Sequence, residues 1–158
     1  MCEGLNRTIM FDNFALTLFK AQNECTLSWV TQDGGPAATV VSYIYADGCI
    51  WMTAMTHQAR VKAITKNAKV AVVVSGKGCK VGDTRCVSMR GQCEVLTSRD
   101  IRDWFFPLFS KKVLNNRLGA KLMAKSMNNE NNLVLKFTPE KVIPYDAQNM
   151  MKMAKIMP

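Results

Sequence analysis

The chain has 158 residues, of which 48% are hydrophobic, and a formal net charge of +9 at pH 7. A chain of this length and apolar content can bury a core without disulfides, so we expect residues 1–158 to form a single globular domain and not a disordered segment. No apolar run is long enough to span a bilayer and the N-terminal residues lack a secretion signal, which predicts a cytoplasmic protein with no membrane partner.

The positive charge suits an anionic ligand, but its distribution does not favour nucleic acid as the partner. The basic residues form modest clusters, at residues 77–85, 111–125 and 152–155. Aromatic and basic side chains do not alternate in the way that stacks single-stranded bases. The charge therefore favours an anionic small molecule over a nucleic acid.

The first part of the chain predicts one helix followed by three neighbouring antiparallel strands. Apolar residues at helical spacing indicate a helix over residues 11–22, with Asp12 or Asn13 as its N-cap. Runs of β-branched and aromatic residues, separated by turns rich in Gly, Pro and Asp, then indicate strands at residues 25–31, 37–45 and 49–55.

The second part predicts helices among three further strands. Residues 58–66 form a short basic helix, and residues 98–127 form a long helical region in which Pro107 causes a break or kink. On the inward row of the strand at 85–96, Gly91 indicates a bend or a close backbone approach. The other strands are expected at residues 69–75 and 133–137, followed by an extended tail to residue 146 and a Met-rich end that is a short helix or irregular.

Short antiparallel strands joined by hairpins, with a short internal helix and a long helix before the last strand, predict a small antiparallel β-barrel with helices at its ends. The fold is thus expected to be mainly β, in the α+β class.

Six cysteines and one histidine limit the metal chemistry that the chain can support. No CxxC pair occurs, and buried free thiols are favoured over a metal site built from Cys79, Cys86 and Cys93. The single His57 excludes a two-histidine metal site within one chain, and a polar residue at a strand end is favoured over a catalytic role for it. We therefore predict no metal site and assign no catalytic residue.

The segment from residue 51 to residue 74 has the layout of an anion site. A strand ends in a polar turn, a helix begins with basic residues, and a valine-rich strand follows. A phosphate at such a strand-to-helix transition is stabilised by free backbone N–H groups, by the helix dipole and by nearby hydroxyl and cationic side chains. The candidate groups are those of Thr53, Thr56, Gln58, Arg60 and Lys62. A solvated helix with ordinary surface cations explains the same residues equally well.

Several short motifs, in order, make the chain resemble the pyridoxamine 5′-phosphate oxidase-like FMN-binding split barrels. They are DGGP at 33–36, DG at 47–48, WMT at 51–53, RVKAI at 60–64, NAKV at 67–70, VSMRGQCEV at 87–95 and KFTPEKV at 136–142. The resemblance covers most of the chain. It implies a split antiparallel β-barrel with Greek-key character that forms a homodimer with FMN at the subunit interface.

The resemblance also implies cofactor-binding residues. Val40, Val41 and Ser42 would lie along the flavin ring and ribityl chain, largely through their backbone, and Thr53 would approach the ring edge or the chain. Gln58, Arg60 and Lys62 would hold the phosphate.

Departures from the family pattern argue against oxidation of pyridoxamine phosphate itself. The segment ATVVSY at 38–43 lacks both cations of the oxidases' Arg-x-Val-Leu-Leu-Lys strand, and Cys86 replaces a flavin-contacting Gln. The C-terminal Trp and Arg substrate motif is also absent from the sequence. The resemblance therefore implies an FMN-dependent oxidoreductase acting on another small molecule. The alternatives are a flavin-binding electron carrier or sensor, and a relative that binds deazaflavin or haem.

Overall fold

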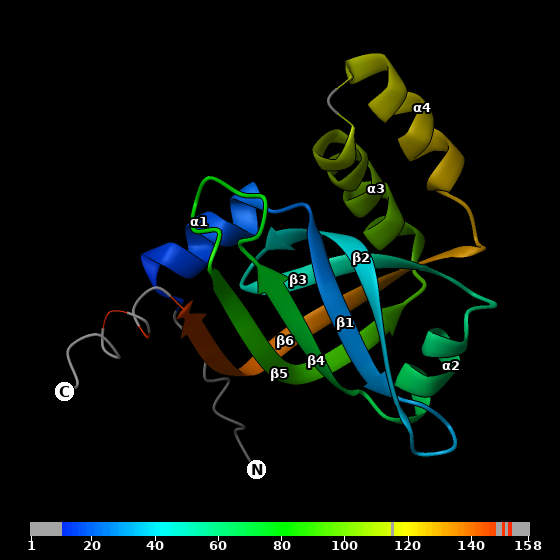
Figure 1. Cartoon of the computed structure of the whole chain (residues 1–158). Helices are drawn as coiled ribbons and strands as arrows, with labels where there is room; N and C mark the ends of the chain where they lie inside the picture. The colour runs from blue at the N-terminus through cyan, green and yellow to red at the C-terminus, as the bar shows by residue number, and fades with distance from the viewer. Residues whose placement is uncertain (1–10, 115, 148–149, 151, 153–158) are drawn as a thin grey trace, which may run out of the picture.

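Six strands and four helices make up the part of the chain that the structure describes (Figure 1). The computed structural model describes residues 11–114, 116–147, 150 and 152. The strands are β1 Glu24–Val30, β2 Pro36–Ala46, β3 Cys49–Met55, β4 Lys69–Ser75, β5 Arg85–Leu96 and β6 Asn132–Asp146. The helices are α1 Asn13–Ala21, α2 Ala59–Lys66, α3 Arg99–Val113 and α4 Arg117–Met127. Within these ranges, no helix combines the length and the apolar character that crossing a membrane would require.

The strands close into an antiparallel barrel in the order β1-β2-β3-β6-β5-β4, with β4 paired back to β1. The last strand lies between β3 and β5, so the order is not sequential, and the predicted Greek-key barrel of the α+β class is confirmed. β6 has 15 residues and serves two ladders. It pairs with β3 from Asn132 to Phe137 and with β5 from Val134 to Asp146.

Two apolar clusters hold the fold together. Inward side chains of all six strands fill the barrel, among them the fully buried Tyr43, Met52, Met89 and Phe137, and Phe19 of α1 packs against them. The second cluster lies outside the barrel wall, where Trp51 and Val134 pack against the aromatic side of α3 formed by Phe105, Phe106 and Phe109. α3 therefore covers part of the outer face of β2, β3 and β6.

α1 covers the barrel interior and is tied to α3. Asp12 caps the helix, because its Oδ1 accepts a hydrogen bond from the Ala15 N–H at 2.7 Å. Lys112 of α3 donates a hydrogen bond to the Phe19 carbonyl at 3.1 Å and lies 4.2 Å from the centroid of the Tyr43 ring. Burial lowers the pKa of Lys112 to about 8, since the charged ammonium is partly withdrawn from water.

Most predicted elements occur at the predicted positions. The strands at 49–55, 69–75 and 85–96 have the expected bounds, and the tight turn between β2 and β3 is formed by Asp47 and Gly48, with φ values of 51° and 74°. The N-terminal residues 1–10 and most of the Met-rich end lie outside the described residues. Residues 138–146, expected as an extended tail, belong to the paired strand β6.

The helix break considered at Pro107 is wrong. α3 continues through Pro107 to Val113, and Asn116 begins a new helix by accepting hydrogen bonds from the N–H groups of Leu118 and Gly119. Phe105, Phe106 and Phe109 are buried on both sides of the proline. Their packing against the barrel outweighs the lost hydrogen bond, which propensity alone cannot foresee.

The predicted burial of thiols is confirmed for three cysteines. Cys25, Cys49 and Cys93 are buried, whereas Cys79 and Cys86 are partly exposed. Burial raises the pKa of both Cys25 and Cys93 to about 12. Cys2 lies outside the described residues.

The close approach expected at Gly91 is also confirmed. The β5–β6 register shifts between Arg90 and Gly91, and β6 crosses so closely that a Cβ on Gly91 would lie 2.0 Å from the Thr138 carbonyl oxygen. Because that neighbour is backbone of the strand that closes the barrel, it cannot move aside cheaply.

Gly91→Ala is expected to lower the free energy of unfolding by about 3 kcal/mol, since overpacking must displace β6. Gly119→Ala in α4 is the matched control, because the nearest atom to its new Cβ would be 3.7 Å away. The control should be neutral or stabilising by up to about 1 kcal/mol. Denaturant unfolding of both variants measures the difference, and equal midpoints would contradict the close approach.

Candidate functional site

The strands β2 and β3 pair only at one end, and the site lies where they separate. Their ladder runs from Ala46 and Cys49 to Tyr43 and Met52. Beyond that point Ser42 pairs with Glu24 of β1, while Thr53 pairs with Val134 of β6. Ser42 and Thr53 therefore flank the point of separation on the outer surface of the barrel.

Side chains of β2 alternate between the inside and the outside of the barrel, and this alternation separates its three predicted ligand residues. Val40 is 60% exposed and Val41 only 9%, and Val41 belongs to the core inside the barrel. Val40 and Ser42 face outward. Val41 can meet a ligand only through its backbone, which is the way the family resemblance implied.

The turn from β3 into α2 leaves the start of the helix without a side-chain cap. Gln58 occupies the N-cap position, but its Oε1 accepts a hydrogen bond from the Met55 N–H at 2.9 Å instead of from the helix. The first turn of α2 also contains no acidic residue. The Val61 N–H donates to the Gln58 carbonyl at 3.0 Å, so the N–H groups of Ala59 and Arg60 and the positive end of the helix dipole are available to an anion.

Arg60, in the first turn of α2, is a partly buried cation with poor compensation. Its Nη2 donates a long hydrogen bond of 3.5 Å to the Thr53 carbonyl, and its Nε is buried with no hydrogen-bond partner. No salt bridge to Arg60 occurs among the described residues. Burial lowers the pKa of Arg60, because desolvation disfavours the charged form. An anion placed here would supply the missing partner.

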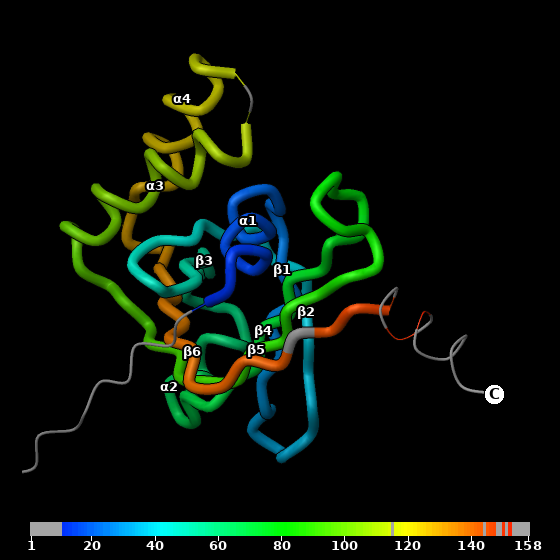
Figure 2. Tube along the Cα trace, turned by 90° about the vertical axis from the view of Figure 1, so that its left-hand side faces the viewer, coloured from blue at the N-terminus to red at the C-terminus, as the bar shows by residue number. Residues whose placement is uncertain are grey.

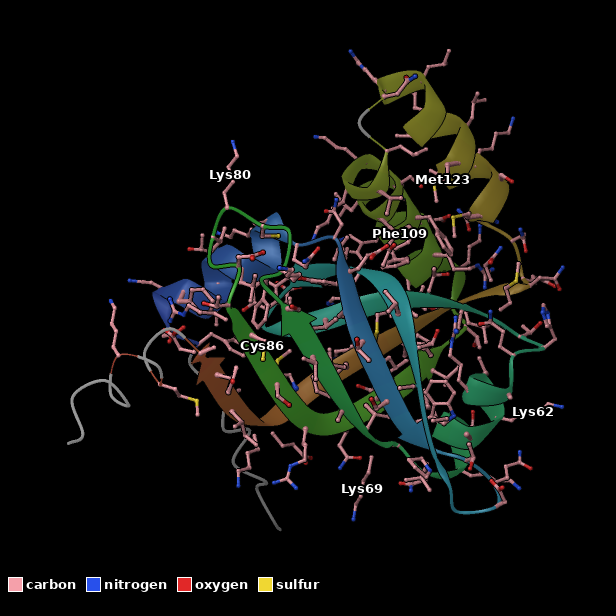
Figure 3. All side chains as sticks on the ribbon, in the orientation of Figure 1. Lys62, Lys69, Lys80, Cys86, Phe109 and Met123 are labelled. Atoms are coloured by element: carbon pink, nitrogen blue, oxygen red, sulfur yellow. The ribbon has the colours of Figure 1, made fainter. Side chains whose placement is uncertain are left out.

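Lys62 is not brought to the same place as Arg60. The two residues are two positions apart in one helix, which puts their side chains roughly 200° apart around its axis. Lys62 is exposed and points away from the barrel (Figure 3). The structure therefore groups Ser42, Thr53, Gln58 and Arg60, with Val40 one step further along β2, and leaves Lys62 apart.

One outward row of the barrel contains no charged residue, although the protein carries a net charge of +9 and the neighbouring outward rows include Glu24 on one side and Arg90 and Lys141 on the other. Strand pairing aligns this row across five strands: Val40, Thr26, Val73, Ser88 and Ile143. The row begins beside the site, and its ends are open to solvent, with Val40 60% and Ile143 45% exposed. No local sequence pattern indicates this row, because it depends on the register of five strands.

A family comparison identifies the chain. Residues 11–146 match the model of the family described as pyridoxamine 5′-phosphate oxidase. The chain belongs to this family. The predicted split barrel is the family's fold. Among curated protein sequences, none gives a significant match to this chain.

Solved structures share the fold at low sequence identity. A conserved hypothetical protein from Mycobacterium tuberculosis is 18% identical, with a TM-score of 0.74 over 91% of this chain and 90% of that one. A protein described as F420 reductase is 14% identical, with a TM-score of 0.66 over 85% and 98%. An FAD-binding protein from Mesorhizobium loti is 19% identical, with a TM-score of 0.63 over 85% and 94%. Identities this low establish the fold alone.

Arg60→Met is expected to abolish the rise in melting temperature that inorganic phosphate gives the ligand-free protein, while the melting temperature without phosphate stays the same or increases. Methionine keeps the apolar contacts of the stem and removes a poorly compensated charge. Lys62→Met is the matched control and should retain most of the response. A phosphate response equal in both variants would place the anion elsewhere, and a large loss of stability without phosphate would make Arg60 a structural residue.

Proposed function

We propose that the chain is an FMN-dependent oxidoreductase of the split-barrel type that acts on a small molecule other than pyridoxamine phosphate. The observation that carries the proposal is the buried, unpartnered Nε of Arg60 beside an uncapped helix start. An arginine in this state fits a phosphate group, which accepts several hydrogen bonds and carries the missing negative charge. Family membership and relatives described as an F420 reductase and an FAD-binding protein support a flavin-type cofactor.

The residues around Arg60 follow one another along the surface in the order that the phosphate, the ribityl chain and the ring of FMN would require. Its phosphate would bind the Arg60 guanidinium and the first N–H groups of α2. The hydroxyl groups of Ser42 and Thr53 suit the polar ribityl chain, and the exposed Val40 offers an apolar surface to the ring. When bound, the flavin supplies hydride or electron transfer, so the protein needs only to bind it, orient it and limit water.

A deazaflavin is the second candidate cofactor, because one of the similar structures is described as an F420 reductase and the match covers 98% of that chain. The same cation and helix start would serve its anionic tail. Haem is less well supported, since His57 stands exposed in the turn before α2.

We also propose a homodimer whose interface is centred on the uncharged outward row. A stable interface buries about 800 Å² on each partner, and its centre is depleted of charged residues. The row from Val40 to Ile143 meets that description and borders the proposed flavin site. A partner subunit placed there would cover the ring and exclude water from it.

Reconstitution with FMN tests the cofactor. After removal of excess FMN, the wild-type protein should keep a visible flavin spectrum. Arg60→Ala should weaken FMN binding by about 2 kcal/mol, roughly 30-fold, because a charge-assisted hydrogen bond to phosphate is lost. Lys62→Ala, the matched control, should weaken it less than about threefold. If the wild-type protein retains no FMN but binds F420, the cofactor is F420 and not FMN. If it binds neither, the proposal is refuted.

Sedimentation velocity at micromolar concentration tests the dimer. The wild type should sediment as a dimer, and Thr26→Glu should sediment as a monomer because it places a charge within the uncharged row, next to Val40. Thr17→Glu, on the exposed side of α1, is the matched control and should remain dimeric. A monomeric wild type would rule out the interface irrespective of how the variants fold.

A further inference from the structure

The helices α3 and α4 form a hairpin that stands off the barrel. Both views show α3 against the barrel and α4 beyond it (Figures 1 and 2). Met123, Ala124 and Met127 of α4 pack against the aromatic cluster of α3. Ala120 is also buried, whereas Leu118 and Leu122 face solvent and are 67% and 62% exposed.

A groove of about 770 Å³ runs between the two helices. Its apolar lining consists of Pro107 and Leu114 from α3 and its C-cap, and of Ala120 and Ala124 from α4. Its cationic lining consists of Lys111 from α3 and of Arg117 and Lys121 from α4. Cations therefore stand on both sides of a floor made of small apolar side chains.

The three cations lack acidic partners. None of them takes part in a salt bridge among the residues that the structure describes. The sequence explains why, since residues 104–129 contain no Asp or Glu. The groove is thus an apolar surface flanked by cations that no acidic residue neutralises. A partner that complements it would be apolar on one face and acidic along both edges of that face.

We propose that this groove binds an acidic amphipathic helix of a partner protein. The helix would complete a three-helix arrangement with α3 and α4. Its apolar face would lie on Ala120 and Ala124, whose small side chains permit the backbones to approach closely. Carboxylates at its two edges would meet Lys111 on one side and Arg117 and Lys121 on the other. The lining residues of each helix span about 10 Å, which accommodates about two helical turns.

Other occupants fit less well. A second copy of the hairpin would bring the same cations together, which costs free energy. The C-terminal segment of this chain, residues 147–158, contains Lys152 and Lys155 and no acidic residue, so it does not complement the groove. A flat bilayer would contact the outward Leu118 and Leu122 and could not enter the concave floor.

The test measures binding of a labelled synthetic peptide by fluorescence anisotropy, with the full-length protein at low salt. The probe is a helix-forming peptide of about 15 residues with Leu on one face and Glu along both edges, since shorter helices are marginal in water. A peptide of the same composition in scrambled order is the peptide control. Lys121→Glu, which lies in the groove, is compared with Lys125→Glu, one turn further along α4 and outside the groove lining.

We expect the wild-type protein to bind the amphipathic peptide. Lys121→Glu should bind it about tenfold more weakly, and Lys125→Glu should bind it within about twofold of wild type. Equal weakening by both variants would overturn the proposal, because it indicates a general charge effect. Equal binding of the scrambled peptide would also overturn the proposal. A third contradicting outcome is that no peptide binds while the protein binds anionic lipid vesicles and Leu122→Ser abolishes that binding. The circular dichroism and melting temperature of each variant establish that the hairpin is folded.

Discussion

The barrel depends on one long strand that pairs on both edges. β6 carries the ladder to β3 with its first half and the ladder to β5 along most of its length, and residues 134–137 belong to both. This arrangement closes the wall only if β6 can cross β5 closely, and Gly91 provides the space. Gly91 thus permits the close crossing of the two strands at the point where the β5–β6 register shifts.

The candidate site follows from that closure. β3 pairs with β6 from Ile50 to Met55, whereas β2 pairs with β3 only as far as Tyr43 and with β1 from Ser42 onward, so the outward residues Ser42 and Thr53 flank a break in the β2–β3 ladder. β3 then leads into the turn before α2, where the side chain of Gln58 folds back to β3 and leaves the helix start uncapped. Arg60 then lies over the Thr53 carbonyl without a carboxylate. The geometry of an anion site thus arises as a by-product of how the barrel is closed.

The sequence predicted those parts of the fold that local chemistry controls. The turn at Asp47 and Gly48 and the end of the short helix at residue 66 were predicted correctly, because each depends on a few adjacent residues. Pro107 was misjudged, since the burial of aromatic residues in α3 is a tertiary effect. In the site, the strand-to-helix layout indicated Arg60. The arrangement of β2 and β3 at the site, in contrast, depends on the pairing of β3 with a strand about 80 residues away, and no local pattern encodes that pairing. The opposite directions of Arg60 and Lys62 were accessible from helix periodicity alone.

The burial of Cys25 and Cys93 protects the barrel interior against oxidation, as the proposed flavin chemistry would require. Oxidation and alkylation of cysteine proceed through the thiolate, and reduced flavins that meet oxygen release hydrogen peroxide. Burial raises the pKa of the Cys25 and Cys93 thiols to about 12, so both stay protonated at neutral pH. Cys79 and Cys86 lie outside the core, so oxidative damage to the described part of the chain is expected to begin at the surface and to leave the packing of the barrel intact.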